Sequence, residues 1–428
     1  MKILNSIIED VHRKIFGHEV SIAMKDFIGN LSWSFAGIFF GSLILFIINV
    51  LAGRILGPEG YGRYNLVLVI ANIVSMPILL GMDLTSIKYI SNAKNRIEKR
   101  KYLSNSFWLV LSSSLVVFIL GVFFYSKVSI FLNIAPSIMF IAIIFSIVLS
   151  FKSLLDSFIK SFDFFKFQSI TKIIESIFII TFFMIFFYVF NRVDYQYYIY
   201  SLLIGALALC LIYFFKIKKN IVRYDKEKFK DIISYSKATI VMVFIYTTMN
   251  YMDKIFVGKF LGARSFGVYS AYLTVSMVFI SQGVLMLGNV FLPAINKVGN
   301  KKEIIKKIDK LAIIFFVPAT LAIFVFSSLV LRFYGKEFQF NHWYVLLFSV
   351  LAFLQIPSDF YKNIASSENK SYILMKKMFI YIPFILAILY CVAFSMKDLN
   401  GFFYAVVLYS LYSLSFLFIS RFSCEMIK

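Results

Sequence analysis

The sequence predicts an all-α integral membrane protein with about twelve transmembrane helices. Hydrophobic residues fill 60% of its 428 positions and charged residues only 15%, against about 25% charged residues in an ordinary soluble domain. The apolar residues form long blocks, such as 38–51, 107–125 and 177–190. A helix needs about 20 mostly apolar residues to cross a bilayer core. Because these blocks are apolar on all sides and do not alternate, we expect membrane-spanning helices rather than barrel strands.

Twelve apolar segments, separated alternately by tight turns and by longer charged loops, give the order of the elements. The predicted spans are 28–51, 64–87, 104–125, 131–151, 169–190, 195–215, 233–256, 266–290, 309–331, 341–361, 372–394 and 400–420. They divide the chain into an N-terminal segment (1–27), a first six-helix lobe (28–215), a basic linker (216–232), a second six-helix lobe (233–421) and a tail (422–428).

Positive charge alternates between the two sides of this map. One side receives 33 of the 44 Lys and Arg residues, and the other receives 10. Because positive loops stay in the cytoplasm, the basic side is predicted to be cytoplasmic, with both termini there and an even number of spans in the inner (plasma) membrane. The net charge of +22 then reflects topology and contact with anionic membrane lipids, not binding of nucleic acid.

A short motif recurs at the same place in each half. Residues 52–64 read AGRILGPEGYGRY and residues 257–269 read VGKFLGARSFGVY, at a constant offset of 205. Each copy joins the first two spans of its half, and an even number of spans separates the copies. We therefore expect a parallel repeat, related by a pseudo-two-fold axis along the membrane normal. The repeated glycines are predicted to build tight helical hairpins: Gly53, Gly57 and Gly62, then Gly258, Gly262 and Gly267.

Two stretches carry a family resemblance. RILGPEGYGRYNLVLVIANIVSMPILLGMDLTSIKYIS (54–91) and MNYMDKIFVGKFLGARSFGVYSAYLTVSMVF (249–279) resemble polysaccharide-biosynthesis flippases of the Wzx type. These belong to the superfamily that also holds multidrug exporters and the lipid II flippase. The resemblance implies two lobes around a central cavity and transport by alternating access. It also implies a cargo of undecaprenyl-diphosphate-linked oligosaccharide, moved from the inner to the outer leaflet for assembly of O-antigen, capsule or exopolysaccharide.

Ionisable residues within or near the spans are the candidate site residues, because charge inside a membrane is costly. A diphosphate needs cationic partners, and Lys237, about three turns inside span 233–256, is the first candidate. Arg54, Lys88 and Lys254 are further substrate-binding candidates. Asp83 and Asp253 are candidate sites for coupling to H⁺ or Na⁺.

Each candidate also has a simpler explanation. Arg54, Lys88 and Lys254 would be equally satisfied by reaching to the membrane interface. Asp83 would be satisfied by capping or pairing near the membrane surface, and Lys237 by a place at the cytoplasmic interface. The sequence leaves these alternatives open.

Two other classes of function compete with the flippase. An ion-coupled multidrug exporter of the same superfamily should carry acidic residues deep in its first lobe, where the ionisable candidates of this chain are basic or lie near the ends of the spans. A membrane-bound glycan polymerase or transferase should carry a large outer loop or an outer acidic pair, and neither is seen. The chain has no P-loop, HExxH or GxSxG motif and no Cys or His spacing for a metal, so we expect no enzyme activity, no metal and no cofactor. Polymerases and glycosyltransferases are candidate partners.

Overall fold

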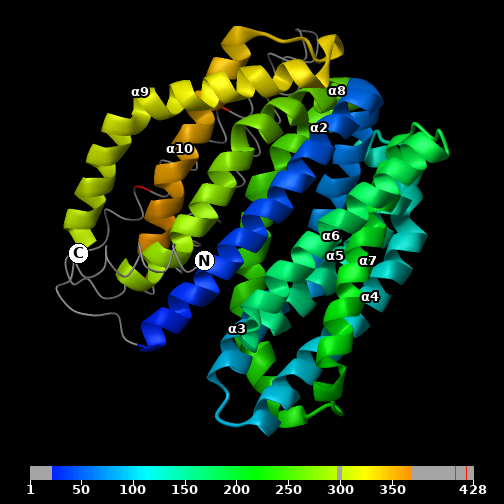
Figure 1. Cartoon of the computed structure of the whole chain (residues 1–428). Helices are drawn as coiled ribbons and strands as arrows, with labels where there is room; N and C mark the ends of the chain where they lie inside the picture. Colours follow the sequence, from blue (N-terminus) through cyan, green and yellow to red (C-terminus); the bar gives the residue numbers. More distant parts are fainter. Residues whose placement is uncertain (1–21, 296–300, 368–409, 411–420, 422–428) are drawn as a thin grey trace.

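The computed structural model describes residues 22–295, 301–367, 410 and 421, and every regular element in these ranges is a helix (Figure 1). Seven of the described helices are long and apolar enough to cross a membrane. Large apolar side chains such as Phe123, Ile313 and Trp343 point outward and are 75–78% exposed, as expected for a surface that faces lipid. The predicted all-α, multi-pass membrane class is confirmed.

The first two predicted spans form one element, α2 (Ile22–Leu79), which folds back on itself at Gly57. Gly57 has φ 66° and ψ 175°, a left-handed φ that glycine adopts at little cost. A straight helix would separate residues 49 and 61 by about 18 Å. Instead the Tyr61 hydroxyl donates to Asn49 Oδ1 at 2.5 Å, so the two arms of α2 lie antiparallel.

The seventh and eighth predicted spans repeat this arrangement in α8 (Lys226–Ile295), which folds back at Gly262 with φ 76° and ψ 174°. The hydroxyl of Tyr269 donates to Asp253 Oδ2 at 2.5 Å, where a straight helix would place these residues about 24 Å apart. Gly57 and Gly262 are equivalent at the offset of 205, so the repeated motif forms the same backbone turn twice.

The two hairpins also pack against each other. A Cβ added to Gly62 would overlap the carbonyl oxygen of Ala263, and one added to Gly267 would overlap that of Pro58. Because Pro58 and Ala263 are themselves equivalent at the offset of 205, the contact is reciprocal. The hairpins are therefore related locally by a two-fold operation.

The remaining helices fall into two groups, one on each side of the α2–α8 contact (Figure 1). With α2, the first group holds α3 (Met82–Asn92), α4 (Arg96–Leu132), α5 (Pro136–Ser161), α6 (Phe165–Met184), the π-helix η1 (Ile185–Val189) and α7 (Tyr195–Ile217). The second group holds α8, α9 (Lys301–Tyr334), the short η3 (Lys336–Phe338) and α10 (His342–Ser367).

Local sequence explains where several of these helices begin and end. Asn95 caps α4 by accepting a hydrogen bond from the Glu98 amide at 2.8 Å, and α5 begins with Pro136 in its first turn, a favoured place for proline. Leu80 and Gly81 have left-handed φ values of 49° and 68°. The predicted span 64–87 is therefore wrong in its second part, because the chain breaks there and restarts as α3.

The basic segment between the two groups is fixed on α4. It runs from the end of α7 through η2 (Lys218–Asn220) to Lys226. Asn105 exchanges two hydrogen bonds with the backbone of Asp225, at 2.8 and 3.0 Å. The Lys101 ammonium pairs with the Asp225 carboxylate at 2.7 Å. The predicted span 372–394, the predicted span 400–420 apart from Ser410, and the tail 422–428 lie outside the described residues.

Candidate functional site

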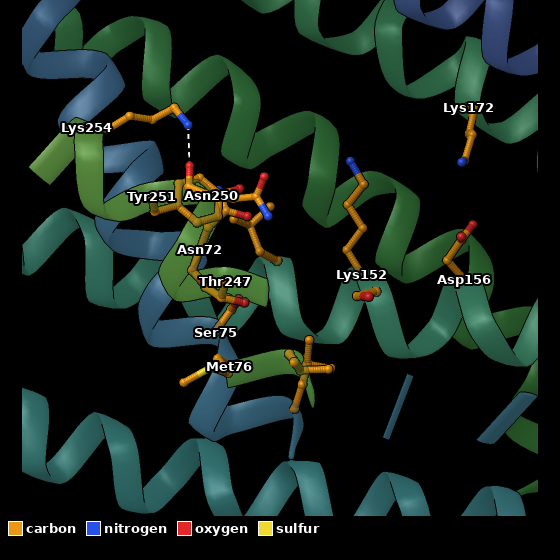
Figure 2. Close-up of a pocket in the computed structure, with 14 residues that line it drawn as sticks. Asn72, Ser75, Met76, Lys152, Asp156, Lys172, Thr247, Asn250, Tyr251 and Lys254 are labelled. Atoms are coloured by element: carbon orange, nitrogen blue, oxygen red, sulfur yellow. Dashed lines mark hydrogen bonds between the residues drawn. The ribbon is translucent and has the colours of Figure 1, made fainter. Parts of the chain in front are cut away.

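A cavity of about 540 Å³ lies between the two helix groups (Figure 2). The α2 wall has Asn72, Ser75, Met76 and Leu79, and the α5 wall has Leu149, Lys152, Ser153 and Asp156; α6 supplies Lys172, and α8 supplies Val243, Thr247, Asn250, Tyr251 and Lys254. The first three helices belong to the first group and α8 to the second, so a molecule in this cavity would contact both groups.

Charged residues of α5 and α6 occupy one end of the cavity. The Lys152 ammonium pairs with the Glu175 carboxylate, and the Lys160 ammonium pairs with Asp156 Oδ2 at 2.9 Å. Gln168 also donates to Asp156 Oδ1, at 2.6 Å. Both carboxylates are thus held by a lysine of their own, as buried carboxylates require.

Lys172 is the one lysine at this end of the cavity that forms no ion pair with a carboxylate of the described residues. Figure 2 shows its ammonium turned toward Asp156, but among the described residues no carboxylate lies within ion-pair distance of it. A half-buried ammonium without a direct partner is costly. Lys172 is therefore available to an anion in the cavity.

Lys254 stands at the other end, on α8 (Figure 2). Its ammonium donates to the backbone carbonyl of Asn250, one turn earlier, and lies 5.1 Å from the centre of the Tyr251 ring. Its nearest carboxylate oxygen, Asp253 Oδ1, is 3.8 Å away, which is beyond a hydrogen bond. A single flexible side chain could leave these contacts and turn to a ligand.

Neutral polar groups line the space between the two charged ends. Asn72 and Ser75 come from α2, and Thr247 and Asn250 from α8. The Asn72 amide donates to the Leu68 carbonyl at 2.7 Å, which leaves its oxygen to accept. Amides and hydroxyls of this kind are suited to the hydroxyl groups of a sugar.

The predicted cationic residues lie in different places, and only Lys254 lines the cavity. Lys237 is exposed on α8 and Arg54 is exposed on α2, both outside the cavity lining. The Lys88 ammonium lies 3.6 Å from the centre of the Tyr235 ring, where it joins α3 to α8. Lys237 is therefore not a lining residue of this cavity, and its role in substrate binding stays a prediction.

The two predicted acidic residues are both near the cavity but not in its lining. Asp83 lies in the first turn of α3, directly after the break at Gly81. Asp253 is only 1% exposed and adjoins Lys254. In both side chains, atom Oδ1 is buried and has no hydrogen-bond partner.

Sequence reasoning missed Lys152 and Lys172, which it counts only among the Lys and Arg residues of the basic side. Lys152 follows an apolar block directly, and Lys172 lies inside the predicted span 169–190. The rule that makes any ionisable residue within a span a site candidate would have identified Lys172.

Buried tyrosines lie beside the hairpins, where the two helix groups meet. The Tyr61 hydroxyl of α2 lies 3.3 Å from the Tyr334 hydroxyl of α9 and 3.4 Å from Thr274 Oγ1 of α8. Tyr334 also donates to Asn49 Oδ1 at 3.3 Å. These contacts join the two helix groups directly.

A comparison with protein families assigns the sequence to one of them. The profile of a family described as "Polysaccharide biosynthesis protein" matches residues 27–299. The chain belongs to this family. The predicted family resemblance is confirmed. A search of curated protein sequences finds no match.

Solved structures of membrane transporters share the fold of this family member. An inward-facing multidrug resistance MATE transporter of the MOP superfamily is 12% identical, with 90% of this chain and 94% of that chain covered and a TM-score of 0.69. A Vibrio cholerae MATE transporter variant is 12% identical, with coverage of 94% and 96% and a TM-score of 0.60. A MOP superfamily transporter from Pyrococcus furiosus, titled for the reverse polarity of its binding pocket, is 12% identical, with coverage of 94% and 96% and a TM-score of 0.56.

Proposed function

We propose that this protein moves a polyprenyl-diphosphate-linked oligosaccharide across the membrane, from the inner to the outer leaflet, by alternating access. One observation carries the proposal. Lys172 of the first helix group and Lys254 of the second face the same cavity, and neither ammonium is hydrogen-bonded to a carboxylate of the described chain. The site thus offers two cationic groups, one on each side.

The charge of the cavity favours an anion over a cation. Lys152 is neutralised by Glu175 and Asp156 by Lys160. Lys172 has no carboxylate of the described chain within ion-pair distance, and Lys254 has only Asp253, 3.8 Å away and beyond a hydrogen bond. A diphosphate diester carries negative charge, which would have no partner in the hydrocarbon of the membrane. The two ammonium groups would bind it by donating charge-assisted hydrogen bonds. The amides and hydroxyls between the two lysines would receive the adjoining sugar.

Alternating access follows from where the two helix groups touch. The glycine hairpins and the Tyr61–Tyr334 contact join the groups at one end, and the cavity separates them further along. We propose that residues 28–215 and 233–421 are two six-helix lobes that rock about a pseudo-two-fold axis along the membrane normal. In this proposal the basic segments are cytoplasmic, so the hairpins close the outer end.

A multidrug exporter is the second candidate, because MATE transporters of solved structure share the fold. A cationic drug would meet Lys172 and Lys254 in this cavity and would be repelled. The electrostatics therefore favour the anionic cargo.

Reconstituted translocation tests the proposal. Full-length protein in proteoliposomes is given a fluorescent polyprenyl-diphosphate disaccharide in the inner leaflet, and outward movement is followed by the reduction of the fluorophore by a membrane-impermeant reductant added outside. Lys172→Gln and Lys254→Gln should each slow translocation about tenfold or more, since each removes a hydrogen bond to a charged group. Lys237→Gln, on α8 but outside the cavity lining, is the matched control and should retain the rate.

The same preparation separates the rival functions. If wild-type protein leaves the lipid-linked disaccharide in place but exports a cationic dye along an ion gradient, the exporter assignment is correct and the flippase proposal fails. If all three lysine variants translocate as fast as wild type, a diphosphate site at Lys172 and Lys254 is ruled out.

A further inference from the structure

The junction of α7 and η2 carries two lysines that rest on aromatic rings at the surface of the first helix group. The Lys216 ammonium lies 4.9 Å from the centre of the Phe164 ring and 5.3 Å from the centre of the Phe167 ring. The Lys218 ammonium lies 4.6 Å from the centre of the Phe215 ring. Both lysines are exposed, and among the described residues no carboxylate forms an ion pair with either of them. Their ammonium groups can therefore donate hydrogen bonds to an anion.

The turn between α5 and α6 fixes one of the rings that support Lys216. Asp163 has a left-handed φ of 58°, and the Phe164 amide donates to the Ile159 carbonyl at 3.1 Å. These features close the C-terminus of α5, as a left-handed residue commonly does. The Phe162 ring stacks on the Phe164 ring, with centres 6.0 Å apart. The aromatic support of the lysine is thus part of the folded turn.

An apolar face of α7 leads to these lysines. Leu207, Leu211 and Phe215 follow one another at intervals of four residues and are 46%, 56% and 61% exposed. Residues at this spacing lie on the same side of a helix, and large apolar side chains with this exposure are expected to contact lipid. The lipid-facing surface of α7 therefore ends at the place where its two lysines begin.

We propose that the aromatic and basic residues at this end of α7 bind one anionic phospholipid in the leaflet next to the basic segments. The site consists of Phe164, Phe167, Phe215, Lys216 and Lys218. The two ammonium groups bind the phosphate of the headgroup, and an acyl chain lies along the exposed face of α7. Lysine side chains extend over apolar surface with their charged ends in the membrane interface. The site lies outside the cavity, so it does not depend on the proposed cargo.

The chemistry of the site favours a phospholipid over a free anion. A free phosphate would contact two ammonium groups whose charge is screened by salt, and it would leave the exposed rings and the apolar face of α7 uncovered. A zwitterionic headgroup carries a cation of its own, which the two lysines would repel. An anionic phospholipid satisfies the lysines and covers the apolar face at the same time.

Site-specific fluorescence quenching tests the proposal. The full chain is prepared with its three natural tryptophans replaced by phenylalanine and with Phe215→Trp as the reporter, in nanodiscs that mix phosphatidylglycerol and phosphatidylcholine. Bromine atoms on the acyl chains of one lipid or the other quench the reporter and show which lipid contacts it. Each lysine near a membrane surface contributes about fivefold to the binding of anionic lipid. We therefore expect the reporter to prefer phosphatidylglycerol by about 25-fold, which is fivefold for each of the two lysines.

Variants that each remove one charge identify the lysines. Lys216→Gln and Lys218→Gln should each lower this preference about fivefold. The matched control is Lys226→Gln, which removes the same charge from an exposed lysine that contacts no aromatic ring among the described residues. It should leave the preference unchanged. If Lys226→Gln lowers the preference as much as the other two variants, the effect comes from general surface charge, and the site is refuted.

A second measurement uses the unaltered chain. Its thermal unfolding in detergent is followed after addition of phosphatidylglycerol, phosphatidylcholine or inorganic phosphate. Because a ligand that binds only the folded protein raises the unfolding temperature, phosphatidylglycerol should raise it most in wild type and less in a variant with both Lys216→Gln and Lys218→Gln. Equal stabilisation by inorganic phosphate would indicate a site for free anions, and equal quenching by the two brominated lipids would mean that no headgroup is selected. Either result overturns the proposal.

Discussion

The backbones of Gly62 and Gly267 lie against each other, although 205 residues separate them in the chain. Each glycine leaves room for a carbonyl of the opposite hairpin, from Ala263 and Pro58 respectively. The two copies of the repeated motif therefore do more than turn the chain. They form a backbone-to-backbone contact between the two helix groups, and any movement of the groups must be accommodated there.

Gly62→Ala and Gly267→Ala should both destabilise the protein, because the new methyl group would overlap the backbone, which cannot move aside as a side chain can. Overpacking of this kind costs about 1–3 kcal/mol. The measurement is thermal unfolding in detergent. Gly41→Ala is the matched control on α2, since a Cβ there would meet Ser176 Oγ at an ordinary distance of 3.5 Å. An unchanged unfolding temperature in both hairpin variants would contradict the close backbone contact.

The tyrosine contact beside the hairpins should be energetically coupled. Tyr61→Phe and Tyr334→Phe each remove one of two hydroxyls that lie 3.3 Å apart and share Asn49 Oδ1. In a double-mutant cycle on the unfolding free energy, we expect a coupling of about 0.5–1.5 kcal/mol. The cycle Tyr61→Phe with Tyr213→Phe, two buried tyrosines in separate core clusters, should give additive effects. Additivity in both cycles would mean that the hydroxyls do not interact.

The hairpins and the helix order could be predicted from the sequence, because both depend on local signals. Gly57 and Gly262 have the positive φ that a tight turn requires, and their recurrence at a fixed offset gave the relation between the halves. The break at Leu80–Gly81 was missed because the apolar residues continue across it, although Pro77 lies just before it and Gly81 forms part of it. Hydropathy reports what lies next to lipid and not where the backbone changes direction.

The cavity was only partly predictable, for a related reason. Lys152 faces the interior between helices, so it shortens an apolar block and ends the predicted span 131–151 early. Lys172 also lines the cavity, but it lies at the start of the predicted span 169–190 and was counted with the charges of the basic side. A hydropathy profile then predicts that a charged segment lining the cavity is a loop outside the membrane. The sequence places Lys254 and Lys237 in one predicted span, and only Lys254 lines the cavity. Depth along a helix does not say which face a side chain occupies.

The basic linker should be held to α4 by Asp225. Its carboxylate accepts from the Glu227 and Lys228 amides at 3.1 Å as the cap of α8 and pairs with Lys101. Asp225→Ala should free the linker and increase trypsin cleavage at the exposed Arg223. Asp194→Ala, which removes the cap of α7 through its contact with Gln196, is the control. Equal cleavage of both variants would show that Asp225 does not hold the linker.

The same contact gives a pH dependence. The hydrogen bond from Lys101 is the largest cause that lowers the pKa of Asp225 from its ordinary 3.8. A lowered folded-state pKa contributes stability above the ordinary value and loses it as pH falls through the folded one. The Trp108 indole donates to Val222 of the linker at 3.2 Å, so its fluorescence reports on the linker. In a variant with Trp108 as its one tryptophan, emission should be constant from about pH 5 to 8 and shift below about pH 4.

The proposed orientation makes a direct prediction for reporter fusions. A cytoplasmic reporter should be active after residue 96, at the start of α4, and after residue 223, in the linker, because both segments are rich in Lys and Arg. A fusion after Arg192, between η1 and α7, should instead be active with an outer-side reporter. Outer-side activity at position 96 or 223 would overturn the assigned topology.

Lys152 and Lys172 should respond differently to substitution, although both line the same end of the cavity. Lys152 pairs with Glu175, a carboxylate that is 4% exposed. Lys152→Met should therefore destabilise the protein by about 3–5 kcal/mol, because it leaves a buried charge unpaired. Adding Glu175→Met should restore most of that stability, since two apolar side chains can replace a buried ion pair.

Lys172→Met should cost little stability, because no carboxylate of the described chain pairs with it, and should still abolish anion binding. If Lys172→Met destabilises as strongly as Lys152→Met, Lys172 is a structural partner, and the distinction between a structural lysine and a ligand-binding lysine at this end of the cavity is wrong.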